Sequence, residues 1–137
     1  MKASALLPGF LALGLPFYGF AQGPLSALPS PIIQNVTNAP NPFDSRRPGL
    51  EGQTQISYVL IADSNVRVTV YDLFGVKVRT WAFNSGDDGG RAGQNQFSWD
   101  GTNAQGQKVA KGGYLALIAV DNPTATAKTI RKIGVIH

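Results

Sequence analysis

The sequence predicts an all-β protein, an antiparallel sandwich of about seven short strands. Two observations predict it: apolar and polar residues alternate with a period of two, and turn residues recur at short intervals between these segments. In addition, no segment shows the spacing of a convincing amphipathic helix. Strands of this number and spacing are typical of immunoglobulin-like and fibronectin-III-like sandwiches.

The start of the chain, residues 1–21, is typical of a signal peptide. Lys2 precedes an uncharged run that ends near Phe20, and small residues stand at Gly19 and Ala21. Signal peptidase reads small residues at such positions, so we expect cleavage between Ala21 and Gln22. The alternative is an uncleaved membrane anchor, but prolines and glycines interrupt the run and make a poor spanning helix. We therefore expect a secreted protein, located outside the cell or at its surface.

Residues 22–37 are expected to form a proline-rich tether that ends in a possible first strand. The first part of this segment has three prolines and no helical or strand period. Ile32, Ile33 and Val36 then begin the first apolar stretch. Residues 38–137 are expected to form the sandwich itself.

Within the sandwich, the alternating segments predict strands in chain order. In one of them Val66, Val68 and Val70 share a face, while Arg67 and Thr69 share the other, as in a half-buried antiparallel strand. The predicted strands cover residues 54–60, 66–71, 76–81, 95–99 and 114–120, with a last strand in residues 127–136.

The predicted turns are rich in aspartate, asparagine and glycine. Asp72 and Gly75 flank a tight hairpin, in which glycine adopts positive φ at little cost. Side chains of the Asp and Asn type satisfy turn backbone groups, and this predicts turns at residues 100–106. Trp99 precedes these turns and is expected to close one end of the core. The Tyr114 ring is expected to be buried, with its hydroxyl bonded to a neighbouring loop.

Taken in order, these motifs resemble the Ig-like domain in the C-terminal part of flagellar hook-capping proteins, the FlgD type, and related terminal domains of secreted Gram-negative proteins. The resemblance covers about residues 38–137 and implies a module that packs against other proteins, caps an assembly or is read by an export apparatus. It transfers no catalytic residue. The residues that carry it are Asn41, Pro42, Phe43, Asp72, Gly75, Trp99, Asp100, Gly101, Gly106, Gly113 and Tyr114.

Composition argues against an enzyme and against a cofactor. The chain has no cysteine, and its only histidine, His137, is the last residue, so neither thiol chemistry nor a Ser/His/Asp arrangement is expected. The formal net charge is +4, with the basic residues scattered, so no nucleic-acid partner is expected. Asp87 and Asp88 in a glycine-rich loop could bind a cation through oxygen ligands, but such residues are also ordinary turn formers, and we expect no metal site.

Four aromatic residues, Phe43, Phe74, Trp81 and Phe83, form a candidate docking surface for proteins or sugars. The alternative is that they complete the core, as strand aromatics usually do.

These observations favour a non-catalytic structural or interaction protein, a subunit or adhesive module of an extracellular or cell-envelope assembly such as a surface layer or filament. Its partners would be other protein subunits, either copies of itself or envelope proteins, bound through edge strands, and not a small-molecule substrate. Two alternatives remain: a C-terminal sorting or anchoring domain of the type IX secretion kind, whose turns are similar, and a polysaccharide-binding module.

Overall fold

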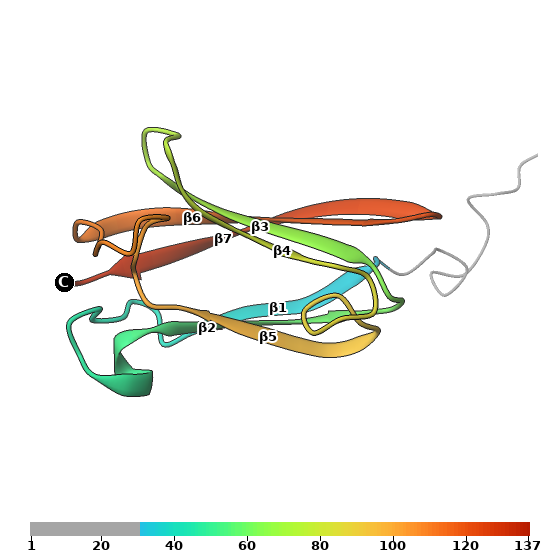
Figure 1. The fold of residues 1–137 in the computed structure, drawn as a ribbon, viewed down its shortest axis with the longest axis horizontal. Coiled ribbons are helices and arrows are strands. Elements are labelled where there is room, and N and C mark those ends of the chain that lie inside the picture. The colour runs from blue at the N-terminus through green and yellow to red at the C-terminus, as the bar shows by residue number, and fades with distance from the viewer. Residues whose placement is uncertain (1–30) are drawn as a thin grey trace, which may run out of the picture. The chain divides into compact units, whose positions relative to one another are not determined.

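The structure, a computed structural model, describes residues 31–137 and shows an antiparallel sandwich (Figure 1). This confirms the predicted all-β fold. The predicted signal peptide, its cleavage site and most of the predicted tether lie outside the described residues. The strands are β1 (Ile33–Ala39), β2 (Thr54–Leu60), β3 (Asn65–Asp72), β4 (Lys77–Phe83), β5 (Gly93–Trp99), β6 (Gly112–Asn122) and β7 (Ala125–Val135).

The strands form two layers. One sheet has three strands in the order β1-β2-β5, and the other has four in the order β4-β3-β6-β7 (Figure 1). The edges are therefore β1 and β5 in the first sheet, and β4 and β7 in the second. β1 pairs with β2 and places the apolar residues after the predicted tether within the three-stranded sheet.

Several strands extend beyond the predicted apolar alternation. β6 and β7 form a long hairpin in which Asp121 pairs with Thr126 and Asn122 pairs with Ala125. The backbone ladder continues there although the side chains are polar, because pairing does not depend on side-chain polarity. A short 3₁₀ turn at Gly49–Gly52, which the sequence does not predict, leads into β2.

Alternate residues of the strands fill the space between the two sheets. Val66, Val68 and Val70 of β3 are almost fully buried, as their period of two predicts. Trp99, at the end of β5, is fully buried, with its ring centre 5.8 Å from that of Phe43 and 5.5 Å from that of Tyr114. These three rings close one end of the core, and edge-on packing of this kind stabilises aromatic clusters.

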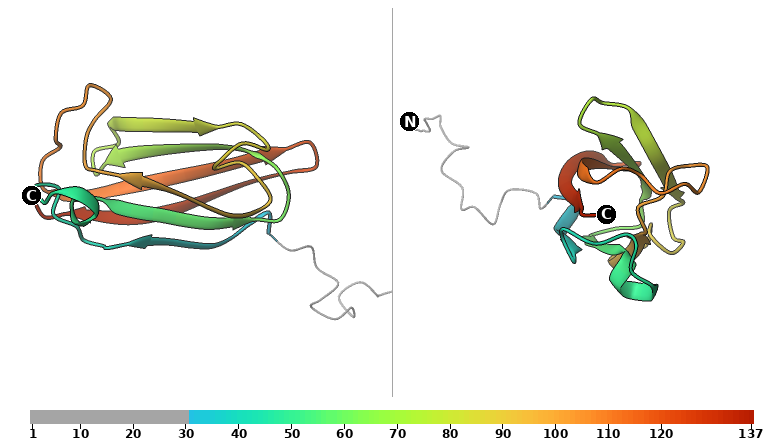
Figure 2. Two further views of the ribbon diagram at one scale, coloured as in Figure 1. Left: turned by 60° about the horizontal axis from the view of Figure 1, so that its bottom comes forward. Right: turned by 90° about the vertical axis from the view of Figure 1, so that its left-hand side faces the viewer.

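One side of the sandwich is sealed by the chain itself. The amide of Phe43 donates to the carbonyl of Gly134 (2.9 Å), and the amide of Ile136 donates to the carbonyl of Phe43 (2.9 Å). The Asn41 side chain accepts from the amide of Gly134 (2.8 Å) and donates to the carbonyl of Lys132 (2.9 Å). These bonds occupy outer backbone groups of β7 at Lys132 and Gly134, so the Asn-Pro-Phe segment covers the end of this sheet edge. Figure 2 shows the two layers from other directions.

Candidate interaction surface

The described residues offer few groups for catalysis or metal binding. Within residues 31–137, no three His, Asp or Glu side chains lie together as metal ligands would. His137 is exposed at the C-terminus, and its carbonyl accepts hydrogen bonds from the amide and hydroxyl of Ser45. No helix in this part of the chain is long and apolar enough to cross a membrane.

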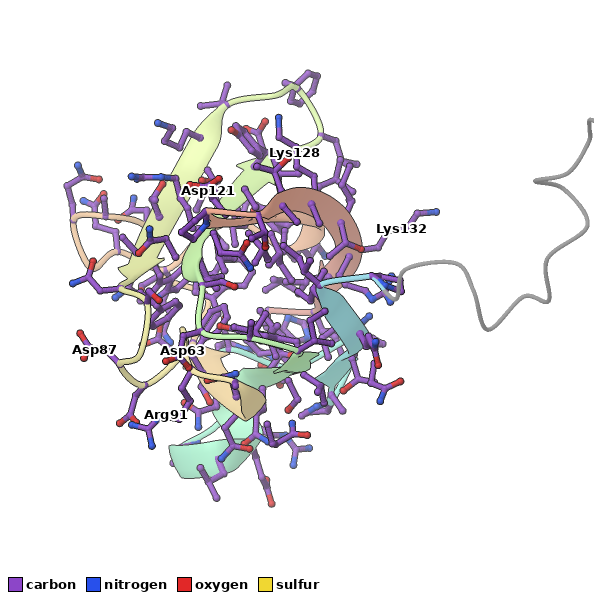
Figure 3. All side chains as sticks on the ribbon, turned by 90° about the vertical axis from the view of Figure 1, so that its right-hand side faces the viewer. Asp63, Asp87, Arg91, Asp121, Lys128 and Lys132 are labelled. Carbon is purple, nitrogen blue, oxygen red and sulfur yellow. The ribbon has the colours of Figure 1, made fainter. Side chains whose placement is uncertain are left out.

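The glycine-rich loop between β4 and β5 carries the two carboxylates considered for a cation. Asp87 and Asp88 are exposed, and Asp88 forms an ion pair with Arg91 (2.5 Å). Figure 3 labels Asp87 and Arg91 on this loop. The expectation that this loop holds no metal ion stays a prediction.

The four aromatic residues of the predicted docking surface do not form one surface. Phe43 is only 2% exposed, because its ring packs against Trp99 and its backbone pairs with β7, so it belongs to the core and its inclusion was wrong. Phe74 is 94% exposed, in the turn between β3 and β4. Trp81 and Phe83 are half-buried on β4 and lie apart from Phe74 along the hairpin.

Trp81 and Phe83 both pack against a third aromatic ring, which the alternation of the sequence does not place on this surface. The ring of Phe97, on β5, has its centre 5.1 Å from that of Trp81 and 5.3 Å from that of Phe83. The three rings fill the gap between edge strands β4 and β5, which belong to different sheets. All three remain partly exposed. We call Trp81, Phe83 and Phe97 the aromatic flank.

Arg79 links the aromatic flank to the loop after β5. Its guanidinium lies 5.1 Å from the centre of the Trp81 ring, donates to the hydroxyl of Thr102, and lies 3.6 Å from the Asp100 carboxylate. Burial alone would raise the pKa of Asp100, but hydrogen bonds from Thr102 and the charges of Lys108 and Arg79 lower it below its usual value. Asp100 therefore stays ionised and holds this loop against β4.

The β3–β4 turn exposes three apolar side chains. The Asp72 carboxylate accepts hydrogen bonds from the amides of Phe74 and Val76 (both 2.9 Å), and Gly75 has a φ of 84°, which favours glycine. This bonding holds the turn in one conformation, with Leu73 68%, Phe74 94% and Val76 59% exposed. The turn projects from the body of the sandwich (Figure 1). We call Leu73, Phe74 and Val76 the hairpin tip.

The outer edge of β4 carries free backbone groups. Backbone groups along a strand point alternately toward one neighbour and away from it. The carbonyl of Val78 points away from β3, because it accepts from the amide of Ala104 (3.1 Å) in another loop. The amide of Asp72 donates to the carbonyl of Val76 (3.0 Å), so Val70 and Val68 also face β4, where they pair with Arg79 and Trp81. Thr80 and Ala82 alternate with these partners and therefore point away from β3, and within residues 31–137 no backbone bond from a loop or turn reaches them. We call the backbone groups of Thr80 and Ala82 the open edge.

Comparison with known proteins identifies the family. The sequence model described as the FlgD Ig-like domain matches residues 48–123, more than half of the chain. The chain belongs to the FlgD Ig-like domain family. This confirms the resemblance read from the turns. A search of curated proteins gives no match.

Solved structures of FlgD proteins share the fold of this FlgD Ig-like domain. FlgD from P. aeruginosa is 24% identical with a TM-score of 0.52, over 72% of this chain and 71% of that one. FlgD from Xanthomonas campestris, described in terms of hook capping in flagellar assembly, is 19% identical with a TM-score of 0.52, over 74% of this chain and 67% of that one.

A third similar structure comes from a much larger protein. Dimeric latent PorU from Porphyromonas gingivalis is 23% identical with a TM-score of 0.57, and the match covers 74% of this chain. This chain spans only 9% of PorU. At such identities these likenesses show the fold alone, and the fold does not determine function. The FlgD Ig-like family itself is non-enzymatic, which supports a non-catalytic structural domain.

The family match includes the hairpin tip, the aromatic flank and the open edge, which all lie between residues 48 and 123. The hairpin tip and the aromatic flank each leave a trace in the sequence. Leu73 and Val76 are apolar residues in a turn, where polar residues are usual. Phe97 shares a face with Trp99 in a predicted strand, but the sequence does not show that β5 lies beside β4.

Proposed function

We propose that this FlgD Ig-like domain is a secreted, non-catalytic structural subunit that joins other protein subunits of the cell envelope or extracellular space through β4. The open edge is the observation that carries the proposal. An added strand would accept and donate hydrogen bonds at Thr80 and Ala82, extending the four-stranded sheet.

The surroundings of β4 support strand addition there. In strand addition, main-chain hydrogen bonds supply affinity, and contacts with alternate side chains supply specificity. A strand beside β4 would lie next to the aromatic flank, whose three rings are partly exposed. At one end of β4 the hairpin tip offers further apolar contact area. Aromatic residues of this kind are enriched at protein interfaces.

At the opposite edge of the same sheet, β7 leaves fewer backbone groups available to an added strand. The last residues of β7 are already bonded to Asn41 and Phe43 through the bonds described above. An added strand would have to displace these contacts. The chain thus covers part of one edge and leaves the other open, which is the asymmetry expected if β4 serves in assembly.

A proline substitution at the open edge tests the proposal. Ala82→Pro removes the outward N–H, and proline is tolerated at strand edges, so the fold should persist. Ala82→Ser at the same position keeps the N–H and serves as the matched control. The native mass of the full chain, recovered from envelope and medium without denaturation, is measured by light scattering after gel filtration.

We expect the unmodified protein and Ala82→Ser to form a complex larger than one chain, and Ala82→Pro to be a folded monomer by far-ultraviolet circular dichroism. A monomeric unmodified protein would overturn the proposal, as would a proline variant that assembles equally well. N-terminal sequencing of the recovered protein tests secretion separately, since processing before Gln22 is expected.

A further inference from the structure

Strand β6 is apolar on both of its faces. Its buried residues alternate with Leu115, Leu117 and Ala119, which are partly exposed and lie outside the core. Antiparallel sheets with one solvated face normally place polar residues there, whereas strands apolar on both faces are typical of sheets covered on both sides. Figure 1 shows the two layers from the side, and no strand or helix of residues 31–137 lies over this side of the four-stranded sheet.

The register of the sheet defines the surface around these three residues. In β3, Thr69 lies opposite Leu117, and in β7, Ile130 lies opposite Leu117 on the other side. Ile130 is more than half exposed. Each residue of β6 thus has a neighbour on both sides, giving three rows. We call these rows the outer face: Arg67, Ala119 and Lys128; Thr69, Leu117 and Ile130; Tyr71, Leu115 and Lys132. Among them Thr69 is buried, at 6% exposed.

The charges on the outer face all have one sign. Arg67, Lys128 and Lys132 occupy three of its corners and are exposed. Within residues 31–137, none of the three lies within 4.0 Å of a carboxylate. Asp121 lies on the same side of β6, in the row next to Arg67, Ala119 and Lys128, so one carboxylate borders the face beside two of its three cations. Lys132 points away from the sandwich in Figure 3.

Apolar residues surrounded by cations favour some binding partners of the outer face over others. Two copies of this chain placed outer face to outer face would bring six cations together around a desolvated apolar stripe, which like-charge repulsion opposes. A partner with carboxylates around its own apolar residues would instead meet complementary charge. The apolar stripe would supply affinity, and the cations would steer the encounter and fix the register.

We propose that the outer face binds a segment of another protein that presents apolar side chains flanked by Asp or Glu. This interaction is distinct from strand addition at the open edge, because it uses side chains of the sheet face and not the backbone of β4. The two surfaces can therefore fail independently. A subunit with both could contact two neighbours at once.

Synthetic peptides serve as probes of the full chain. One peptide alternates leucine with glutamate, a second of the same length alternates leucine with lysine, and a third alternates serine with glutamate. Amide resonances of the protein are followed by NMR during titration with each peptide. We expect the leucine–glutamate peptide to shift resonances of the outer face and to bind about tenfold more tightly than either of the others.

Variants on the face identify its role. Lys128→Glu combined with Lys132→Glu should reverse the preference toward the leucine–lysine peptide, while Lys111→Glu, at an exposed loop lysine off the face, should leave it unchanged. Leu117→Thr should weaken binding of the leucine–glutamate peptide about tenfold. Should that variant fail to fold, Ile130→Thr tests the same contact at a more exposed position.

Four outcomes would overturn the proposal. The first is equal binding of all three peptides. The second is a set of shifts confined to β4, which would support the open edge alone. The third is binding to phosphatidylglycerol vesicles that depends on Lys128 and Lys132, with no binding of the leucine–glutamate peptide, which would indicate an anionic lipid. The fourth is dimerisation through the outer face, detected by light scattering and abolished by Leu117→Thr.

Discussion

The indole nitrogen of Trp99 donates a 2.8 Å hydrogen bond to the backbone carbonyl of Thr102. The largest side chain of the core is thereby tied to the loop that follows β5. The same loop is held to β4, since Thr102 accepts from Arg79 and Ala104 donates to the carbonyl of Val78. The core and the proposed assembly edge are consequently coupled through one short loop.

We predict that Trp99→Phe lowers the free energy of unfolding by about 2 to 3 kcal/mol. The substitution leaves a cavity where the larger ring was, and it deprives the Thr102 carbonyl of its donor. Urea unfolding followed by far-ultraviolet circular dichroism measures the change. Phe74→Ala is the control: because Phe74 is almost fully exposed, it should change stability by less than about 0.5 kcal/mol. Equal effects of the two variants would contradict the assignment of Trp99 to the core.

Asp72 should determine the conformation of the hairpin tip. Asp72→Ala removes the acceptor of two backbone amides, and we expect a loss of about 1 kcal/mol in stability. Asp72→Asn keeps an acceptor oxygen in the same place and should cost less. Thermal unfolding compares the variants, and amide hydrogen exchange at Phe74 and Val76 should be faster in Asp72→Ala alone. Unchanged exchange in that variant would show that the carboxylate is not needed for the turn.

The turns were largely predictable from the sequence because their chemistry is local. Asp72 bonds to amides two and four residues away, and the Tyr114 hydroxyl donates to the carbonyl of Ala110, four residues earlier. The positive φ of Gly75 and Gly101 is also a local feature, set by the turn in which each glycine lies. Contacts within a few residues leave a direct trace in residue type and spacing.

The candidate surface was less predictable because it depends on contacts between distant strands. Phe43 and Phe74 are both aromatic residues near turns, yet one is buried against Trp99 and the other is almost fully exposed. Phe97 joins Trp81 only because the β5 edge of one sheet lies beside the β4 edge of the other. Which strands lie side by side follows from the topology of the sheets, and the alternation along a single strand does not predict it.

The stability of the protein should fall at alkaline pH because of Tyr58. Burial raises the pKa of Tyr58 from 10.0 to about 12, while its hydroxyl donates to the carbonyl of Gly89 (2.7 Å). The folded state therefore keeps the proton more tightly than the unfolded state. The stabilisation of the folded state by protonated Tyr58 is fully present below pH 10. It is lost as the pH rises toward 12, which lowers the free energy of unfolding by about 1 to 2 kcal/mol. Urea unfolding between pH 9 and pH 12 measures the loss, which Tyr58→Phe should reduce; an equal loss in that variant would assign it to other groups.

The seal of β7 can be tested at a pair of glycines that face each other across the β6–β7 ladder. Gly113 pairs with Gly134 in register, yet their surroundings differ. A Cβ at Gly134 would lie 2.9 Å from the Cβ of Pro42, whereas a Cβ at Gly113 would meet only the side chain of Leu73, at 3.4 Å. Gly134→Ala should thus displace the Asn-Pro-Phe segment, and Gly113→Ala should be tolerated.

We expect Gly134→Ala to lower stability by about 1 to 3 kcal/mol, since Phe43 would lose both its ring packing and its bonds to β7. Exposing the outer groups of β7 also creates a second open strand edge, which favours association. Light scattering should show larger species for Gly134→Ala than for Gly113→Ala at the same concentration. If Gly134→Ala is as stable and as monodisperse as its control, the Asn-Pro-Phe segment does not protect β7, and the asymmetry between the two edges loses its basis.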